Sequence, residues 1–74
     1  MSTGSIYEVY YGVHLDDDYQ IKSMEFVAER DHDEKFIMNV NGSDVVYIKE
    51  NLCTPSEAVQ IAQDMLKEHR NQGK

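Results

Sequence analysis

The chain has 74 residues, one cysteine and a formal net charge of −7. This length suits one small domain, and a single cysteine excludes an internal disulfide framework. Residues 1–34 hold nine acidic and two basic residues, whereas residues 35–74 are balanced. A concentrated negative field repels nucleic acid and anionic lipid and attracts basic protein surfaces, so we expect neither direct nucleic-acid binding nor membrane binding.

We expect residues 1–74 to form a single domain, with residues 1–4 and 71–74 frayed. Residues 1–5 lack the apolar core of a secretory signal, and no apolar run approaches the ~20 residues that cross a bilayer. The lone thiol of Cys53 suits a reducing compartment. The sequence therefore predicts a cytoplasmic protein of a bacterial or host cell.

Apolar residues alternate at period two between residues 6 and 50, which predicts β-strands. We expect one strand over residues 5–15 and a second over residues 19–29, with acidic turns at residues 16–18 and 31–34. The side chains expected toward the core on these two strands are Tyr7, Val9, Tyr11, Val13, Leu15, Met24, Phe26 and Ala28.

Two local patterns refine the strands. Ile21 is out of phase with Met24, which indicates a β-bulge near residues 22–23. The Asn41-Gly42 pair lies between two alternating runs and predicts a tight type I′ hairpin turn. On the third strand, which precedes this turn, Phe36, Met38 and Val40 are expected to point toward the core and Ile37 to point away from it. For the fourth strand, residues 45–49, two core faces remain possible: Val46 with Ile48, or Val45 with Tyr47.

Residues 54–70 are expected to form the single helix of the chain. Thr54 is placed as the N-cap, Pro55 as the first helical residue and Glu57 as the partner that completes a Thr-x-x-Glu capping box. The apolar stripe that would face the sheet is Ala58, Ile61, Ala62, Met65 and Leu66.

The assembled prediction is an α+β domain (ββββα), a four-stranded antiparallel β-meander with one C-terminal α-helix packed on one face. Because one helix covers one face, we expect the other face to be open. That face would carry Ile6, Tyr10, Val27 and Ile37, interleaved with Glu8, Glu25 and Glu29. Exposed apolar surface of this extent indicates a binding face.

The candidate catalytic and metal-binding groups do not form a recognisable site. Residues 31–34, Asp-His-Asp-Glu, are adjacent in a turn and point outward instead of converging. An EF-hand loop counted from Asp16 would need Gly and Glu where Ile21 and Val27 stand. Cys53 precedes a helix N-terminus, where a thiolate would be stabilised, but no histidine is placed beside it. We expect no enzymatic activity, no metal and no cofactor.

The helix start Thr54-Pro55-Ser56-Glu57-Ala58-x-x-x-Ala62 resembles that of the HicB-type antitoxins, small proteins that pair a partial RNase H-like sheet with such a helix. The Gly/Pro-containing segment that precedes the helix in that family is missing, so the chain is not assigned to it. In size, acidity and lack of motifs the chain is also similar to phage-encoded inhibitors of host defence, including anti-CRISPR and DNA-mimic proteins.

We expect the chain to be a non-enzymatic acidic binding protein, an inhibitor or regulator that engages a basic, nucleic-acid-binding type of surface on a partner protein. Acidic residues would steer association and apolar residues would anchor it. The expected contact residues are Glu8, Tyr10, Asp16, Asp17, Asp18, Glu25, Val27, Glu29, Asp31, Asp33, Glu34 and Ile37. The alternative is a HicB-like antitoxin or small homodimeric regulator, in which the open face joins two copies and the charge serves solubility.

Overall fold

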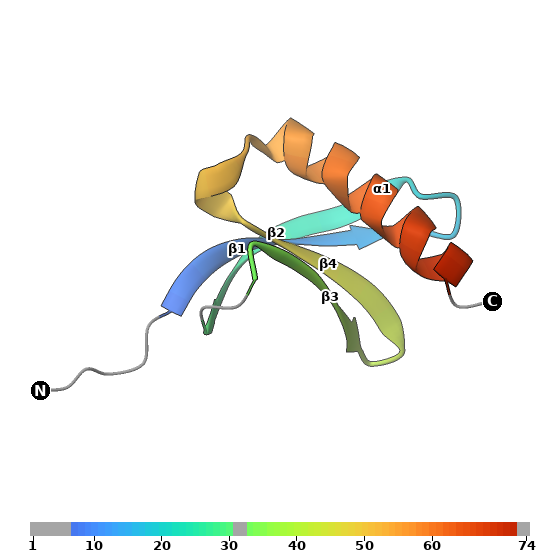
Figure 1. The fold of residues 1–74 in the computed structure, drawn as a ribbon, viewed down its shortest axis with the longest axis horizontal. Coiled ribbons are helices and arrows are strands. Elements are labelled where there is room, and N and C mark those ends of the chain that lie inside the picture. The colour runs from blue at the N-terminus through green and yellow to red at the C-terminus, as the bar shows by residue number, and fades with distance from the viewer. Residues whose placement is uncertain (1–6, 31–32, 73–74) are drawn as a thin grey trace, which may run out of the picture.

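A computed structural model describes residues 7–30 and 33–72 of the chain. Within these residues a four-stranded antiparallel sheet carries one helix across one face (Figure 1), which confirms the expected α+β class. The elements, in chain order, are β1 (Tyr7–Leu15), β2 (Ile21–Arg30), β3 (Lys35–Val40), β4 (Ser43–Lys49), the short 3-10 helix η1 (Glu50–Leu52) and α1 (Pro55–Gln72).

The strand order is β2-β1-β4-β3, which corrects the expected meander. In a meander β2 would lie beside β3, and β4 would be an edge strand. In the structure residues 45–48 of β4 are all buried. A strand that is buried on both faces belongs in the interior of a sheet, here beside β1. The more exposed strands β2 and β3 form the two edges.

Residues 33 and 34, which precede β3, lie close to the place where β1 and β4 meet. The Tyr10 hydroxyl donates to the carbonyl oxygen of Asp33 at 3.3 Å, and the Lys49 N–H donates to the carbonyl oxygen of Glu34 at 2.9 Å. Tyr10 and Lys49 are themselves opposite each other in the β1–β4 pair. Residues 33 and 34 are therefore tied to the two central strands.

The predicted turn and bulge are confirmed. Asn41 and Gly42 have φ angles of 53° and 87°, and positive φ at both central residues is what a type I′ turn requires. In the β1–β2 pair the register shifts between His14 and Leu15 of β1, and Lys22 of β2 has no residue opposite it. This extra residue is the expected β-bulge.

The capping box at the start of α1 is also confirmed. The Glu57 carboxylate accepts the Thr54 backbone N–H at 2.8 Å, and the Thr54 hydroxyl oxygen accepts the Glu57 backbone N–H at 3.3 Å. Two backbone donors that lack a partner within the helix are thereby satisfied. The helix begins at Pro55, as expected, and continues to Gln72 instead of ending at residue 70.

Replacing Thr54 by alanine is expected to lower the free energy of unfolding by about 1 kcal/mol, because the Glu57 N–H loses its acceptor. Urea unfolding followed by circular dichroism measures this change. Thr54→Ser keeps the hydroxyl and is expected to unfold close to the native midpoint. An equal loss in both variants would contradict the capping role.

The capping box also predicts a pH dependence. The Thr54 N–H and hydroxyl hold the pKa of the Glu57 carboxyl below its ordinary value of 4.5. A carboxyl whose pKa is lowered by folding stabilises the fold above its unfolded pKa and loses that contribution as pH falls through the folded value. As pH falls below 4.5, the ordinary pKa of a glutamate, we expect the Tm of the native chain to decrease more steeply than that of Glu57→Gln. Parallel Tm curves from neutral to acid pH would contradict this.

A hydrophobic core lies on each face of the sheet. The helix-side core consists of Tyr11, Val13, Val46, Ile48, Ala58, Ala62 and Leu66. The second core, on the opposite face, consists of Tyr10, Val45 and Tyr47, against which Val27, Phe36, Met38 and Val40 pack. The start of β1 and the turn between β3 and β4 lie on the side away from α1 (Figure 1). Side chains of β2 and β3 pack over the centre of this face.

The second core overturns the expected open face. Tyr10 is 0% exposed, and the Phe36 ring lies edge-on to it with 5.4 Å between the ring centroids. The Phe36 ring also stacks on Tyr47 at 5.1 Å and 7°. The open face was expected because the chain has one helix, whereas side chains of β2 and β3 cover this face.

The predicted orientation of β3 is wrong as well. Ile37 is opposite Val46 and packs against the helix-side core, whereas Phe36 and Met38 pack in the second core. Both faces of β3 are apolar, so alternation alone could not decide which face meets the helix. On β4 both candidate core sets prove to be buried, one in each core.

Phe26 lies on the helix face of β2, as its alternation predicts, but it is 69% exposed. A helix is about 10 Å across and neighbouring strands are ~4.8 Å apart, so one helix covers roughly two strands. The helix α1 packs mainly against β1 and β4. The ring of Phe26 therefore lies beyond it, with its centroid 5.5 Å from that of Tyr11.

Candidate functional site

Three glutamates lie on one face of the ribbon formed by β1 and β2. Glu8 is directly opposite Glu29, and Glu25 is opposite Gly12. Alternation places all three on the face opposite α1, together with Tyr10. We call Glu8, Glu25 and Glu29 the acidic ribbon face. The register confirms that these predicted contact residues share one face.

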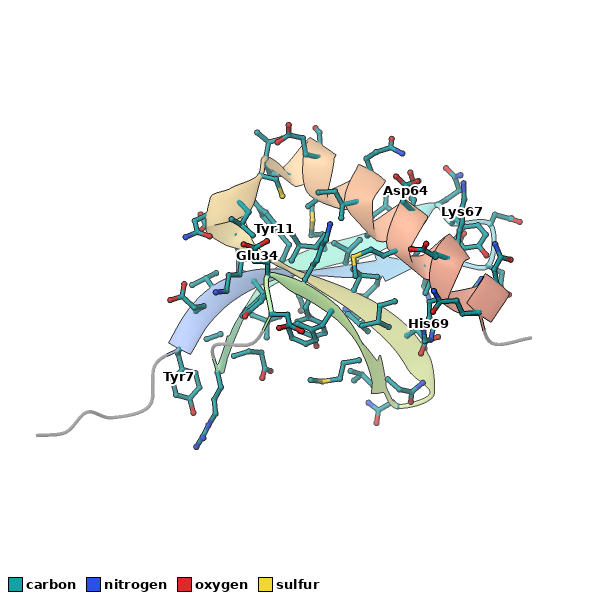
Figure 2. All side chains as sticks on the ribbon, in the orientation of Figure 1. Tyr7, Tyr11, Glu34, Asp64, Lys67 and His69 are labelled. Atoms are coloured by element: carbon teal, nitrogen blue, oxygen red, sulfur yellow. The ribbon has the colours of Figure 1, made fainter. Side chains whose placement is uncertain are left out.

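The first residues of the ribbon extend beyond the central strands. The pairing of β1 with β4 begins at Tyr10, so Glu8 has a neighbouring strand on the β2 side alone within the described residues. Figure 2 shows Tyr7 at this end of the ribbon, away from α1. Glu8 and Glu29 are half-buried at this end of the ribbon, whereas Glu25 is exposed.

The field of these carboxylates reaches the centre of the sheet. Burial raises the pKa of the Tyr47 hydroxyl, and the charges of Glu29 and Glu25 raise it further. The Glu25 carboxylate also lies 3.4 Å from the ring Nε2 of His14. Lys49, opposite Tyr10, is the basic residue of the described strands on this face. Three carboxylates against one lysine leave the face negative.

Asp33 and Glu34 are exposed and follow the end of β2. Their backbone carbonyls are fixed by Tyr10 and Lys49, as described above. The structure therefore brings these two predicted contact residues to the same region of the sheet as Tyr10. The predicted contact residue Asp31 lies outside the described residues, as does His32.

The other acidic turn lies at the opposite end of β2 and has a structural role. The Asp16 carboxylate accepts the backbone N–H groups of Asp18 at 2.8 Å and Gln20 at 2.9 Å. Asp16 and Asp17 line a cleft of about 500 Å³ together with Lys22 and Arg70. Basic side chains thus oppose the charge of this turn, and the structure does not bring it together with the acidic ribbon face.

Three predicted apolar contact residues are less exposed than expected. Tyr10 is fully buried in the second core. Val27 packs against that core, and Ile37 packs against the helix-side core. Tyr10 is therefore a core residue instead of an exposed one, Ile37 lies on the helix face instead of the opposite face, and Val27 is half-buried.

Three of the exposed apolar side chains lie close together on the other face of the ribbon. Tyr7 is 58% exposed, Val9 44% and Phe26 69%, and all three share the helix face beyond the cover of α1. We call Tyr7, Val9 and Phe26 the apolar ribbon face. The sequence contained a signal for it, because four strands and one helix leave part of the helix face uncovered.

Cys53 does not have the environment of a nucleophile. Burial raises the pKa of its thiol, and the nearby Glu57 charge raises it further, so the neutral thiol predominates at neutral pH. Its carbonyl oxygen accepts the Tyr11 hydroxyl at 3.3 Å, which places it in the packing between η1 and β1. Within residues 7–30 and 33–72, no group of three or more His, Cys, Asp or Glu side chains is arranged to hold a metal ion.

Comparisons with protein families, with curated proteins and with solved structures found no match for this chain. In the part of the chain that the structure describes, no helix is long and apolar enough to cross a membrane.

Proposed function

We propose that this chain is a non-enzymatic binding protein that engages a basic surface of a partner protein through the acidic ribbon face and acts as its inhibitor or regulator. The observation that carries the proposal is the placement of Glu8 directly opposite Glu29. Like charges directly opposite each other destabilise a pair of strands. A role in contact with a cationic partner accounts for such a pair.

The spacing of the carboxylates suits arginine and lysine side chains. Glu25 and Glu29 are four positions apart on β2, which is ~13 Å along a strand. Two cationic side chains can each pair with one carboxylate over that distance, and arginine can do so with two parallel hydrogen bonds. Surfaces that bind nucleic acid carry such cations in rows, so they form the class of target that we infer for this face.

The acidic residues 16–18 contribute less under this proposal. The Asp16 carboxylate is engaged in its own turn, and Lys22 and Arg70 lie beside it. The alternative of a homodimer through an open sheet face is not retained, because the second core fills that face.

Affinity capture with two matched variants tests the proposal. Glu8→Gln/Glu25→Gln/Glu29→Gln neutralises the acidic ribbon face. The control, Glu50→Gln/Asp64→Asn/Glu68→Gln, removes the same charge from exposed side chains of η1 and α1; Figure 2 shows Asp64 on α1. Each immobilised protein is exposed to the same cell lysate, and bound proteins are identified by mass spectrometry.

We expect the native chain and the control to retain the same partner and the ribbon variant to lose it. Capture by the native chain is expected to weaken with added salt. Equal retention by all three proteins would show that the acidic ribbon face is not the contact surface.

A further inference from the structure

The outer edge of β2 presents unpaired backbone in the middle of an exposed strand. β2 is ten residues long and lies at one end of the strand order, with β1 as its neighbour among the described residues. Near its middle the Phe26 side chain is 69% exposed. Outward-facing N–H and C=O groups on such an edge are a template for pairing with another strand.

We propose that β2 pairs antiparallel with β2 of a second copy of this chain, about a two-fold axis at Phe26. The pairing joins two four-stranded sheets into one and places both α1 helices on the same side. Neither helix blocks it, because α1 packs mainly against β1 and β4. A two-fold contact of this kind is closed and uses the same surface on both copies.

The side chains of β2 select the register. Residues opposite each other in an antiparallel pair have their side chains on the same face of the sheet. A register is allowed only if the helix faces of the two copies lie on one side, so allowed registers differ by shifts of two residues. Centred on Phe26, the pairs are Phe26 with Phe26, Glu25 with Val27, Met24 with Ala28 and Ser23 with Glu29. A shift of two residues in one direction places Glu25 opposite Glu25 of the second copy. The same shift in the other direction places Glu25 opposite Glu29. Both are disfavoured because like charges would be directly opposite.

The irregularity of β2 limits the paired segment. The bulge at Lys22 interrupts the regular strand, and bulges end strand pairing. The paired stretch is therefore residues 23–29, with Lys22 and Arg30 outside it. Within this stretch the Phe26-centred register pairs all seven residues, and the exposed ring of Phe26 becomes buried against its copy.

Added salt is expected to have opposite effects on this contact between copies and on the binding of a basic partner. Each copy carries a net charge of −7, so repulsion between copies opposes pairing at low salt and is screened at high salt. Added salt is therefore expected to strengthen self-association, whereas it weakens attraction to a basic surface. The two proposals stand or fall separately.

Sedimentation equilibrium of the full chain over a concentration series tests the pairing. We expect a concentration-dependent dimer for the native chain and a monomer for Phe26→Lys at every concentration. Leu52→Lys is the matched control, because Leu52 is also exposed, at 50%, but lies in η1. It is expected to dimerise like the native chain. Circular dichroism verifies that both variants keep the native fold.

Cross-linking tests the register. In a Cys53→Ser background, Phe26→Cys places two thiols opposite each other across the axis, and we expect it to form an interchain disulfide on oxidation. Ala28→Cys places the two thiols four strand positions apart, ~13 Å, beyond the ~7 Å limit between Cα atoms for a disulfide. A native chain that stays monomeric at all concentrations, or equal cross-linking of both variants, would overturn the proposal.

Discussion

Tyr10→Ala is expected to remove a large share of the free energy of unfolding of the chain. Tyr10 is fully buried in the second core and packs edge-on against Phe36. Truncating a buried aromatic side chain to alanine destabilises a protein by about 3–5 kcal/mol. At typical stabilities per residue, a chain of 74 residues has roughly 4–11 kcal/mol in total. Thermal and urea unfolding, followed by circular dichroism, measure the loss.

Two tyrosine variants serve as controls for Tyr10→Ala. Tyr10→Phe keeps the ring and removes the hydrogen bond to the Asp33 carbonyl, so a loss of about 1 kcal/mol is expected. Tyr7→Ala makes the same truncation at a side chain that is 58% exposed, and a loss of under about 1 kcal/mol is expected. Equal stability of Tyr10→Ala and Tyr7→Ala would restore the open face that the sequence predicted.

The features that the sequence predicted correctly are those determined by neighbouring residues. The Asn41-Gly42 turn depends on two residues that tolerate positive φ. The capping box depends on Thr54 and Glu57, three positions apart. The bulge at Lys22 is visible as a break in alternation between Ile21 and Met24. Such chemistry is complete within a few residues and needs no knowledge of the rest of the fold.

Strand order and the covering of the second face depend on residues far apart in the chain. The meander prediction assumed that strands adjacent in sequence are adjacent in space, which holds for β1–β2 and β3–β4 but not for β2–β3. The second core needs Val27 of β2 and Phe36 of β3 to pack against a cluster that contains Tyr10 of β1. No local pattern records how strongly a sheet curves, so the sequence could not show that this face would be covered.

The candidate site likewise contains residues that the sequence placed correctly and residues that it did not. Alternation placed Glu8, Glu25 and Glu29 on one face, because a charged residue marks the phase of its own strand without ambiguity. It failed for the apolar anchors: an apolar residue such as Ile37 fits either face of a strand that is apolar on both. The acidic half of the chain also proved to contain two separate regions, because the turn at residues 16–18 and the ribbon face lie apart along β2.

Neutralising one carboxylate of the acidic ribbon face is expected to raise stability and weaken binding together. Glu8→Gln removes the repulsion between Glu8 and Glu29, so the free energy of unfolding is expected to rise by about 0.2–1 kcal/mol. The same substitution removes a charge that attracts a basic partner. A binding role predicts these opposite changes, whereas a carboxylate that supports the fold would give a loss of stability.

Association kinetics with the captured partner measure the second effect. For the ribbon variant Glu8→Gln/Glu25→Gln/Glu29→Gln we expect the association rate constant to fall by about tenfold or more at low salt, within the range of electrostatic steering. The difference from the native chain is expected to shrink as salt screens the charges. The control Glu50→Gln/Asp64→Asn/Glu68→Gln has the same net charge, so a smaller change in its rate assigns the effect to position. Equal association rate constants for both variants would indicate that the charge serves solubility and not binding. A lower Tm for Glu8→Gln than for the native chain would contradict the destabilising repulsion between Glu8 and Glu29.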